Sequence, residues 1–448
     1  MAVYQPSGRI VMNIKCAVAF TCTSVLLGIL GCLTARAAEA DIPSVPPTTL
    51  WTTCVLDFDA KGDGETDDTA AFQAALDAAA KKGGIVYAPA GTYRIDGALS
   101  VPQGVMLRGV WEAPHHADIG KGTVLYATGH RGNEDGPPFI TLHQSSGVRG
   151  LTIFYPDQIV TDIQPYPWCI QGKGMHGSVR DVTLVNPYKG IDFGTHPNEL
   201  HFIENVFGQP LRLGVFVDQT TDIGRIQNVH FNPHAWERAA HPSGGFDPRI
   251  LWAYLEENFV GFLIGKTDWE YMRDCFVIFA KIGFHFVNTG NGPGNAVLTQ
   301  CGADICPIAV QVDASQAHAG IAFTNAQIMG TVIIGPENRG PVKFVNSGFW
   351  ATRTTNEQVI NKGIGTVTLS ACHFNDWGVA DRDAPCIRIT SGAAIIQGCD
   401  FMNRSKNQIL IEGAATAVSV TGSRLRGGAK IDDRSDGAQV ELAGNLTQ

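Results

Sequence analysis

The sequence predicts an all-β protein, a single-stranded right-handed parallel β-helix of about twelve coils with a capping α-helix at its amino-terminal end. A recurring motif carries this prediction: a hydrophobic residue, two small or polar residues, a small or apolar residue, and a second hydrophobic residue two positions on, as in residues 148–153 and 179–184. The fourth residues of the clearest copies are Leu151, Val182, Val206, Val229, Cys275, Cys301, Ala326, Gly348, Cys372, Cys399 and Ser423. Their spacing is 22 to 31 residues, apart from one step of 46, which is twice 23. A fixed period in the twenties is typical of a solenoid.

Each copy predicts a strand, a tight corner and a second strand. Alternating apolar and polar residues indicate the strands, and Asp or Asn at the corner is turn chemistry. Short strands that begin at Gly190, Gly214, Gly261 and Gly283 give a second register, with steps of 24, 47 and 22. Because the doubled step falls in the same place in both registers, we expect one coil to be hidden by an insertion near residues 232–256. The corner residues are Asp181, Asn205, Asn228, Asp274 and Asn325.

A helix is predicted just before the first coils. Thr66 or Asp67 can cap its start, and Gly83 and Gly84 end it. Its apolar side chains fall on one face and are Phe72, Ala75, Leu76 and Ala79. Since an open β-helix end exposes both core and sheet edge, this helix is expected to cover it.

The chain divides into four predicted parts: a secretory signal at residues 1–40, a linker at 41–53, the cap and first coils at 54–110, and the β-helix at 111–446 with an inserted loop or helix at 232–260. Arg9 and Lys15 precede an apolar stretch at residues 16–33, and small residues follow at a cleavage position. We therefore expect a secreted or periplasmic protein with no membrane segment after cleavage. Lipoprotein processing at Cys32 is the alternative.

The charge and cysteine content of the sequence restrict the kinds of binding partner and covalent bond to be expected. The 33 Lys and Arg against 42 Asp and Glu give a net charge of −9 without any basic run, which argues against a nucleic-acid partner. Cys275, Cys301, Cys372 and Cys399 share one inward place in the repeat, which predicts free thiols in the core. A bond from Cys301 to Cys306, or between coils, is the alternative.

A resemblance to a known family is carried by the amino-terminal region. Residues 57–64, 66–69, 72–75, 89–93 and 104–109 resemble the pectate-lyase-like superfamily, which includes rhamnogalacturonases, polygalacturonase-related glycosidases, epimerase-like proteins and phage tailspikes. The resemblance covers about residues 55–110 closely and the rest only in repeat architecture. It implies a secreted or surface protein that acts on or binds polysaccharide. The aspartates within it are expected to be cap and turn residues. No catalytic residue of the polygalacturonase branch matches in order and register, so none is transferred.

The repeat register places candidate carboxylates. Asp222, Asp268 and Glu199 each lie seven residues before the reference position of their coil, which predicts one column on the turns. With a hidden coil between them, Asp222 and Asp268 would lie two rungs apart, about 9.6 Å. Because about 6.5 to 9.5 Å between carboxyl groups suits an inverting glycosidase, this pair leads the catalytic candidates. Glu270 and Asp218 are the reserve candidates. The same column could instead satisfy turn amides or bind a cation.

The remaining candidates are predicted to bind substrate: Trp269, Tyr271, Trp236, Asp192, His285 and Arg225. Trp269 and Tyr271 offer aromatic faces for a sugar ring. The insertion that carries Trp236 is expected either to form a groove wall or to pack on the β-helix as a loop without a functional role. Asp192, Asp218, His285 and Asp313 are expected to line an acidic groove.

Three functions follow from these residues. The first is a glycoside hydrolase that needs no cofactor. The second is a uronate lyase, which would require Ca²⁺ held by oxygen ligands, or neutralisation by Arg225, Arg273 or Lys266. The third is a non-catalytic polysaccharide-binding rod. The oligomeric state is left open between a monomer and a homotrimer.

Overall fold

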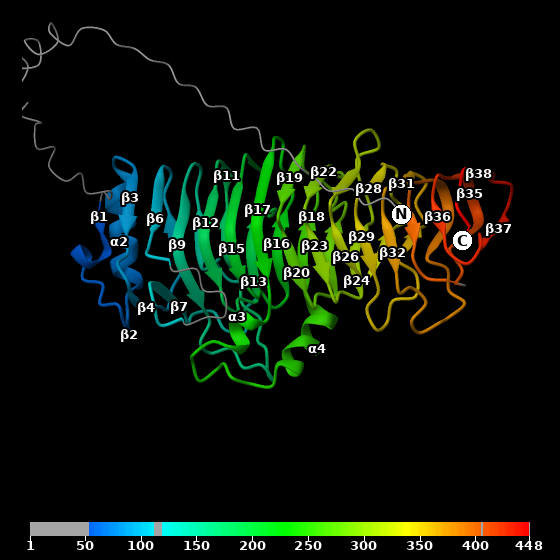
Figure 1. The fold of residues 1–448 in the computed structure, drawn as a ribbon. Coiled ribbons are helices and arrows are strands. Elements are labelled where there is room, and N and C mark those ends of the chain that lie inside the picture. Colours follow the sequence, from blue (N-terminus) through cyan, green and yellow to red (C-terminus); the bar gives the residue numbers. More distant parts are fainter. Residues whose placement is uncertain (1–52, 112–118, 405, 448) are drawn as a thin grey trace, which may run out of the picture. The chain divides into compact units, whose positions relative to one another are not determined.

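In the computed structural model, which describes residues 53–111, 119–404 and 406–447, parallel strands stack coil upon coil along one row (Figure 1). All pairings between the named strands are parallel, and each strand pairs with its equivalents in the coils before and after it. The predicted export signal, residues 1–40, and most of the predicted linker lie outside the described residues. Within the described part, no helix is long and apolar enough to cross a membrane.

Three ladders of strands form the faces of the β-helix. Ladder 1 contains fifteen strands within the described residues. They are β1 (Thr53–Cys54), β3 (Gly84–Tyr87), β6 (Val105–Arg108), β9 (Gly147–Phe154), β12 (Ser178–Leu184), β15 (Phe202–Gly208), β17 (Gly224–Phe231), β19 (Glu270–Arg273), β22 (Ala296–Thr299), β25 (Ile321–Thr324), β28 (Val342–Val345), β31 (Thr366–Ser370), β33 (Ile387–Gln397), β35 (Ile409–Thr421) and β38 (Gln439–Ala443).

Ladder 2 follows ladder 1 around the predicted corner. It uses the second halves of β9, β12, β15 and β17. Its other strands are β2 (Asp63–Asp67), β4 (Gly91–Ile95), β7 (Thr123–Ala127), β20 (Phe276–Ile278), β23 (Gly302–Asp304), β26 (Gln327–Met329), β29 (Gly348–Trp350), β32 (His373–Asn375), β34 (Asp400–Phe401) and β36 (Arg424–Leu425).

Ladder 3 closes each coil and uses the first parts of β33 and β35. Its other strands are β5 (Leu99–Val101), β8 (Ile140–Leu142), β10 (Trp168–Gly172), β13 (Lys189–Phe193), β16 (Leu213–Val217), β18 (Val260–Ile264), β21 (Ile282–Phe286), β24 (Ile308–Val312), β27 (Thr331–Ile334), β30 (Val359–Asn361) and β37 (Ile431–Ser435). A short separate pair, β11 (Gly174–Met175) and β14 (Asn198–Glu199), lies on the turns between ladders 3 and 1.

The parallel β-helix is confirmed, with about fifteen turns rather than twelve, as the length of ladder 1 shows within the described residues. The first clear copy of the repeat motif in the sequence lies in β9. Three further coils, built on β1, β3 and β6, precede it in a stretch whose sequence lacks the motif. Sequence periodicity therefore undercounted coils where the motif has diverged.

The amino-terminal end is covered by α2 (Thr69–Ala80), which follows the short 3-10 helix η1 (Val55–Phe58). The four buried residues of α2 are the predicted ones, Phe72, Ala75, Leu76 and Ala79. The N-cap position is Asp68 rather than the predicted Thr66 or Asp67. Its carboxylate accepts hydrogen bonds from the backbone amides of Lys61 (2.7 Å) and Gly62 (3.0 Å), so this aspartate is a turn residue as expected.

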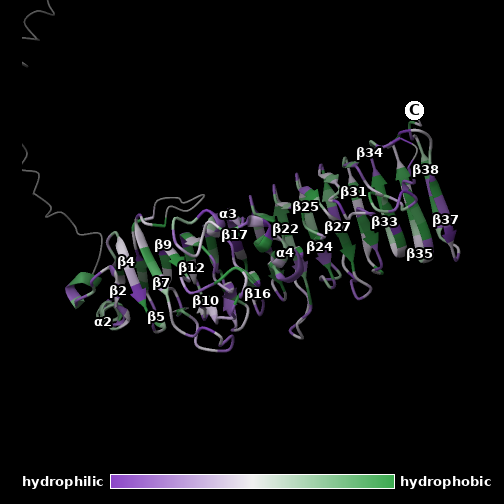
Figure 2. Cartoon of the chain, turned by 90° about the horizontal axis from the view of Figure 1, so that it is seen from below, coloured by the Kyte–Doolittle hydropathy of each residue, from purple (hydrophilic) through white to green (hydrophobic). Residues whose placement is uncertain are grey.

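The interior is packed with columns of like residues, one from each coil. Phe374 stacks on Phe349 at 4.8 Å and on Phe401 at 4.9 Å between ring centroids. All eight cysteines in the described residues are free thiols, and those of the predicted inward column are buried. In Figure 2 the strands carry much of the hydrophobic colour, and the connecting turns are mostly hydrophilic. In such columns the apolar side chains of each coil are buried mainly against those of the neighbouring coils.

The corner between ladders 1 and 2 is held in the left-handed conformation. The predicted corner residues have positive φ, with Asp181 and Asn205 at 54° and Asn228 at 50°. Their side chains also bond along the stack, because Asn228 Nδ2 donates to Asn205 Oδ1 and Asn205 Nδ2 donates to Asp181 Oδ1, both at 2.9 Å. Asn and Asp tolerate this conformation better than residues with larger or branched side chains.

We expect Asn228→Ala to lower the free energy of unfolding by about 1 kcal/mol, because alanine disfavours positive φ and cannot bond to Asn205. Asn228→Gly keeps the backbone conformation and loses only the side-chain bond, so its loss should be smaller. Urea unfolding of both variants measures the difference. An alanine variant as stable as the parent would contradict this account of the corner.

The insertion does not hide a coil. Strand β17 pairs directly with β19 and β20, and β16 pairs directly with β18, so residues 232–259 leave the β-helix and return to the next rung. The excursion contains α3 (His234–Glu237) and α4 (Pro248–Asn258). The predicted helix is present as α4, with Leu251 and Leu255 buried and Asp247 as its N-cap. The prediction of a hidden rung is wrong, because a 46-residue step fits two coils and one coil with an excursion equally well.

Candidate functional site

The candidate carboxylates lie on the turns that join ladder 3 to ladder 1, which we call the edge turns. Two of them matter most: residues 218–223 between β16 and β17, and residues 265–269 between β18 and β19. Because Gly224 pairs with Glu270 and the amide of Thr220 donates to the carbonyl oxygen of Lys266, Asp222 and Asp268 lie on matching turns of neighbouring coils. Their backbones are therefore one rung apart, about 4.8 Å, and the predicted spacing of two rungs is wrong.

Asp222 and Asp268 differ in their surroundings. Asp222 is exposed, and its Oδ1 accepts a hydrogen bond from the amide of Ile223 at 2.8 Å. Asp268 is 44% exposed and faces Lys266, whose Nζ lies 3.4 Å from Oδ2. Its Oδ1 also accepts a 2.7 Å hydrogen bond from Gln316 Nε2. Asp268 therefore faces a cation and an amide donor, whereas Asp222 has only a backbone donor.

Glu199 is displaced from the predicted column. Asn198 forms a bridge with Thr220, which sets Glu199 opposite Thr221. Thr221 Oγ1 donates a short hydrogen bond to Glu199 Oε1. From Thr220 to Arg225 the chain has one residue more than from Asn198 to Phe202, so counting back from the corner mispaired Glu199 with Asp222.

Trp269 projects from the same turn in a strained conformation. Its φ is +63° and its side chain is 55% exposed, and Tyr271 on the adjoining strand is 41% exposed. A bulky residue at positive φ is an outlier that persists only when its surroundings enforce it, and such residues cluster at ligand sites. Both exposed rings lie within three residues of Asp268 in the sequence.

Two amide side chains from later coils hold this turn. The amide of Trp269 donates to Asn295 Oδ1 at 3.2 Å, and Asn295 Nδ2 donates to Gln316 Oε1 at 2.7 Å. Gln316 in turn donates to Asp268. Asn295 and Gln316 were missed by the sequence-based prediction, because no spacing marks a residue one or two coils away that folds back onto this turn.

Two further residues predicted to bind substrate, Arg225 and His285, lie on strands of the two ladders that the edge turns join. Arg225 lies on ladder 1 with Phe202 and Tyr271 as its register partners, so it shares the outer face with the exposed tyrosine. His285 Nε2 lies 2.7 Å from Asp313 Oδ2. Burial raises the pKa of Asp313, but hydrogen bonds from His285 and Gln311 outweigh it and hold this pKa below its usual value.

Asp313 also lines a pocket of about 480 Å³ farther along the same edge. Two charged residues of this pocket, Glu337 and Arg339, were not predicted. Its remaining lining residues are Asn288, Pro293, Ala314, Ser315 and Ala317.

Three predicted acids are not exposed, so the prediction of an open acidic groove is wrong. Asp218 is buried and accepts hydrogen bonds from the amide of Lys266 (2.6 Å) and from Asn291 Nδ2 (2.8 Å). Asp192 is buried beneath the turn that follows it. Its Oδ1 accepts a hydrogen bond from the backbone amide of Gly194 at 2.7 Å. Glu270 points into the core. Strand alternation directs Asp192 away from the core, but the following turn folds back over it.

The prediction that Trp236 binds substrate is also wrong. Trp236 is fully buried in α3 and packs against Phe246 at 5.1 Å between ring centroids. The excursion that carries it leaves the end of ladder 2 and returns to the start of ladder 3. The edge turns lie at the other end of the ladder 3 strands, so this excursion is no wall of the candidate site.

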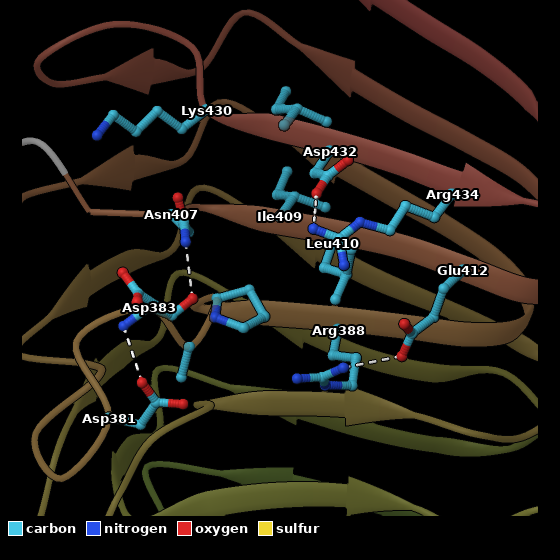
Figure 3. A pocket seen from close by; sticks show the side chains of 13 residues that line it. Asp381, Asp383, Arg388, Asn407, Ile409, Leu410, Glu412, Lys430, Asp432 and Arg434 are labelled. Carbon is cyan, nitrogen blue, oxygen red and sulfur yellow. Dashed lines mark hydrogen bonds and ion pairs between the residues drawn. The ribbon is translucent and has the colours of Figure 1, made fainter.

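A second pocket of about 540 Å³ lies on the last coils (Figure 3). Arg388 sits between Glu357 and Glu412, at 2.9 and 2.8 Å, and Arg434 pairs with Asp432 at 2.5 Å. These charges neutralise one another, so we assign no ligand to this pocket. In the described part of the chain, no group of three or more His, Cys, Asp or Glu side chains is placed to hold a metal ion.

The stacked ladders and the capping helix define a parallel β-helix protein. Residues 52–194 match the family model described as rhamnogalacturonase A/epimerase, pectate lyase-like. This match covers about a third of the chain, and that segment is similar to the pectate-lyase-like family.

The relatives match over short segments. Alginate lyase 7 of Azotobacter vinelandii is 56% identical over 54 residues, which is 12% of this chain and 6% of the relative. Mannuronan C5-epimerase AlgE6 of the same organism is 31% identical over 164 residues, 33% of this chain and 18% of the relative. The chain thus spans less than a fifth of these two proteins.

Among solved structures, the N-terminal fragment of bacteriophage Phi29 gene product 12 is similar in fold. Its TM-score is 0.61 and its sequence identity is 14%, with 88% of this chain and 70% of that one covered. This similarity concerns the fold alone.

Proposed function

We propose that this protein is an exported enzyme that cleaves a polysaccharide at the edge turns, with Asp222 and Asp268 as its acid and base. The observation that carries the proposal is the exposed Trp269, held at positive φ beside Asp268, with Asp222 on the matching turn of the neighbouring coil. An exposed aromatic ring next to two solvent-accessible carboxylates supports a sugar-binding active site.

Hydrolysis is the first reaction that the pair supports. Retaining glycosidases place their carboxyl groups about 5 to 5.5 Å apart, and inverting ones about 6.5 to 9.5 Å. The two backbones are one rung apart, about 4.8 Å, so the carboxyl groups can approach to the spacing of the retaining arrangement. Asp268, which Lys266 and Gln316 hold in place, would be the nucleophile at the anomeric carbon. Asp222 would protonate the leaving oxygen and then activate the water that releases the sugar.

Elimination on a uronate polysaccharide is the second candidate. The relatives are named alginate lyase and mannuronan C5-epimerase, and both names refer to uronate polymers or their units. Lys266 and Arg225 near Trp269 could neutralise a uronate carboxylate, and Asp268 could take the adjacent proton. Ca²⁺ bound by substrate and carboxylate oxygens would serve the same purpose.

One assay separates the candidates. The purified protein is incubated with mannuronan, alginate, pectin and neutral glucans, and new reducing ends and the ultraviolet absorbance of unsaturated uronides are followed together. Reducing ends without absorbance identify the hydrolase, and both signals identify the lyase. Binding without either signal would overturn the enzyme proposal and identify a polysaccharide-binding rod.

Trp269→Ala is expected to weaken polysaccharide binding about tenfold, because the ring supplies much of the exposed apolar surface of the site. The loss should appear mainly in KM or in a binding isotherm. Trp350→Ala, at a ladder 2 position several coils away, is the matched control for removal of a tryptophan. Equal binding by the Trp269 variant and the parent would remove Trp269 from the site.

A further inference from the structure

Directly beneath the candidate site, two titratable side chains meet inside the β-helix. His201 Nε2 lies 3.1 Å from Glu270 Oε1, and both side chains are 0% exposed. The two residues come from coils that are two rungs apart, with Gly224 at the equivalent position between them. A Cβ at Gly224 would lie 2.2 Å from Glu270 Oε2 and 2.3 Å from His201 Cε1, so the contact exists only because this position has no side chain.

The surrounding hydrogen bonds define the state of this pair. Asn198 Nδ2 donates to the carbonyl oxygens of Phe193 (2.6 Å) and Asp218 (2.9 Å), so Asn198 Oδ1 is the acceptor. His201 Nδ1 is 3.0 Å from that oxygen and must carry a proton. One further proton then lies between His201 Nε2 and Glu270 Oε1, because two unprotonated atoms would repel each other there. The pair is neutral overall whichever atom holds the proton.

The pair is tied to both edge turns. Thr267 Oγ1 bonds to Glu270 Oε2 at 3.1 Å, and Thr220 Oγ1 donates to Asn198 Oδ1 at 3.1 Å. Thr267 and Glu270 enclose Asp268 and Trp269 on one turn, and Thr220 precedes Asp222 on the other. A buried neutral pair with every hydrogen bond satisfied fixes its neighbours, whereas breaking one partner leaves the other unpaired.

We infer that His201 and Glu270 are positioning residues that hold the edge turns in register and keep Trp269 at positive φ. Glu270 has to point inward to meet His201, which leaves Trp269, the residue before it, to point outward. The pair touches no solvent and is placed to act through Asp268 and Trp269. Its kinetic consequences rest on the proposed function, but its effect on the turn does not.

The test uses His201→Leu, Glu270→Leu and the double variant. Each single variant keeps the size of the side chain approximately and leaves the other member of the pair without its partner. We expect hydrogen exchange of the amides of residues 269 and 270 to rise about tenfold and kcat to fall about tenfold in each, since small displacements of catalytic groups are costly. In the double variant neither member of the pair is left unpaired, so its losses should be no greater than those of the worse single variant.

Gly224→Ala is a second way to separate the pair and should reproduce the exchange and kcat changes. The control for a general loss of stability is Ser423→Ala. It removes a buried hydroxyl in a distant coil that accepts a hydrogen bond from the backbone amide of Cys399. Parent-like exchange and kcat in both single variants would overturn the inference, as would losses that multiply in the double variant. Should the parent cleave no polysaccharide, faster exchange in the variants would still support the positioning role.

Discussion

Asp268→Asn and Asp222→Asn are each expected to lower polysaccharide turnover about a thousandfold while the protein remains folded. A positioned acid or base contributes about 10² to 10⁴ in rate, and a carboxamide can neither attack the anomeric carbon nor exchange a proton at neutral pH. Both carboxylates are accessible to solvent and neither fills the core, so the melting temperature should change little. Initial rates on the active polysaccharide, together with thermal unfolding, measure both effects.

Asp383→Asn is the matched control, because Asp383 is an exposed carboxylate on the last coils, remote from the edge turns at residues 218–223 and 265–269. It should retain full turnover. If both active-site variants also retained it, the carboxylate pair would not be the catalytic apparatus, and attention would move to His285 and Asp313 on the same edge.

Phe374→Ala is expected to have the largest effect on stability, a loss of about 3 to 5 kcal/mol in the free energy of unfolding. The ring is fully buried and stacks on Phe349 and Phe401, so its removal opens a cavity between three coils. Because each coil of a solenoid contacts mainly its neighbours, the damage should be local. Urea unfolding combined with hydrogen exchange should show loss of protection in β29, β32 and β34 first.

Phe374→Leu refills part of that cavity and is expected to lose clearly less stability than the alanine variant. Equal losses for the two variants would mean that the ring is not packed against its neighbours as described. A loss below about 1 kcal/mol for alanine would mean that the column can collapse around the gap.

The sequence was sufficient to predict the corners of the coils and the buried face of the capping helix. Asn228 and its equivalents predicted the corners because a short polar side chain at a fixed place in each copy indicates left-handed backbone. Phe72 and Leu76 predicted the buried face of α2 because helical periodicity depends on local spacing. Each of these inferences needed only neighbouring residues and the repeat period.

The candidate site was predicted only in part. Asp222, Asp268, Trp269 and Tyr271 are exposed on or beside the edge turns, as expected, although their role is a proposal. The distance between the two aspartates was wrong, because chain length between β17 and β18 does not show whether the intervening residues form a rung or leave the β-helix.

Period, strand direction, corner chemistry and the apolar face of the cap were determined by the sequence alone, because each follows from side chains a few residues apart. Only the tertiary structure decided that Asp222 and Asp268 are on adjacent rungs, that Asp192 and Asp218 are covered, and that Trp236 is in the core. It also decided that Glu270 meets His201 across Gly224. Burial and contact between coils depend on how residues tens of positions apart fold over one another, and no local pattern carries that information.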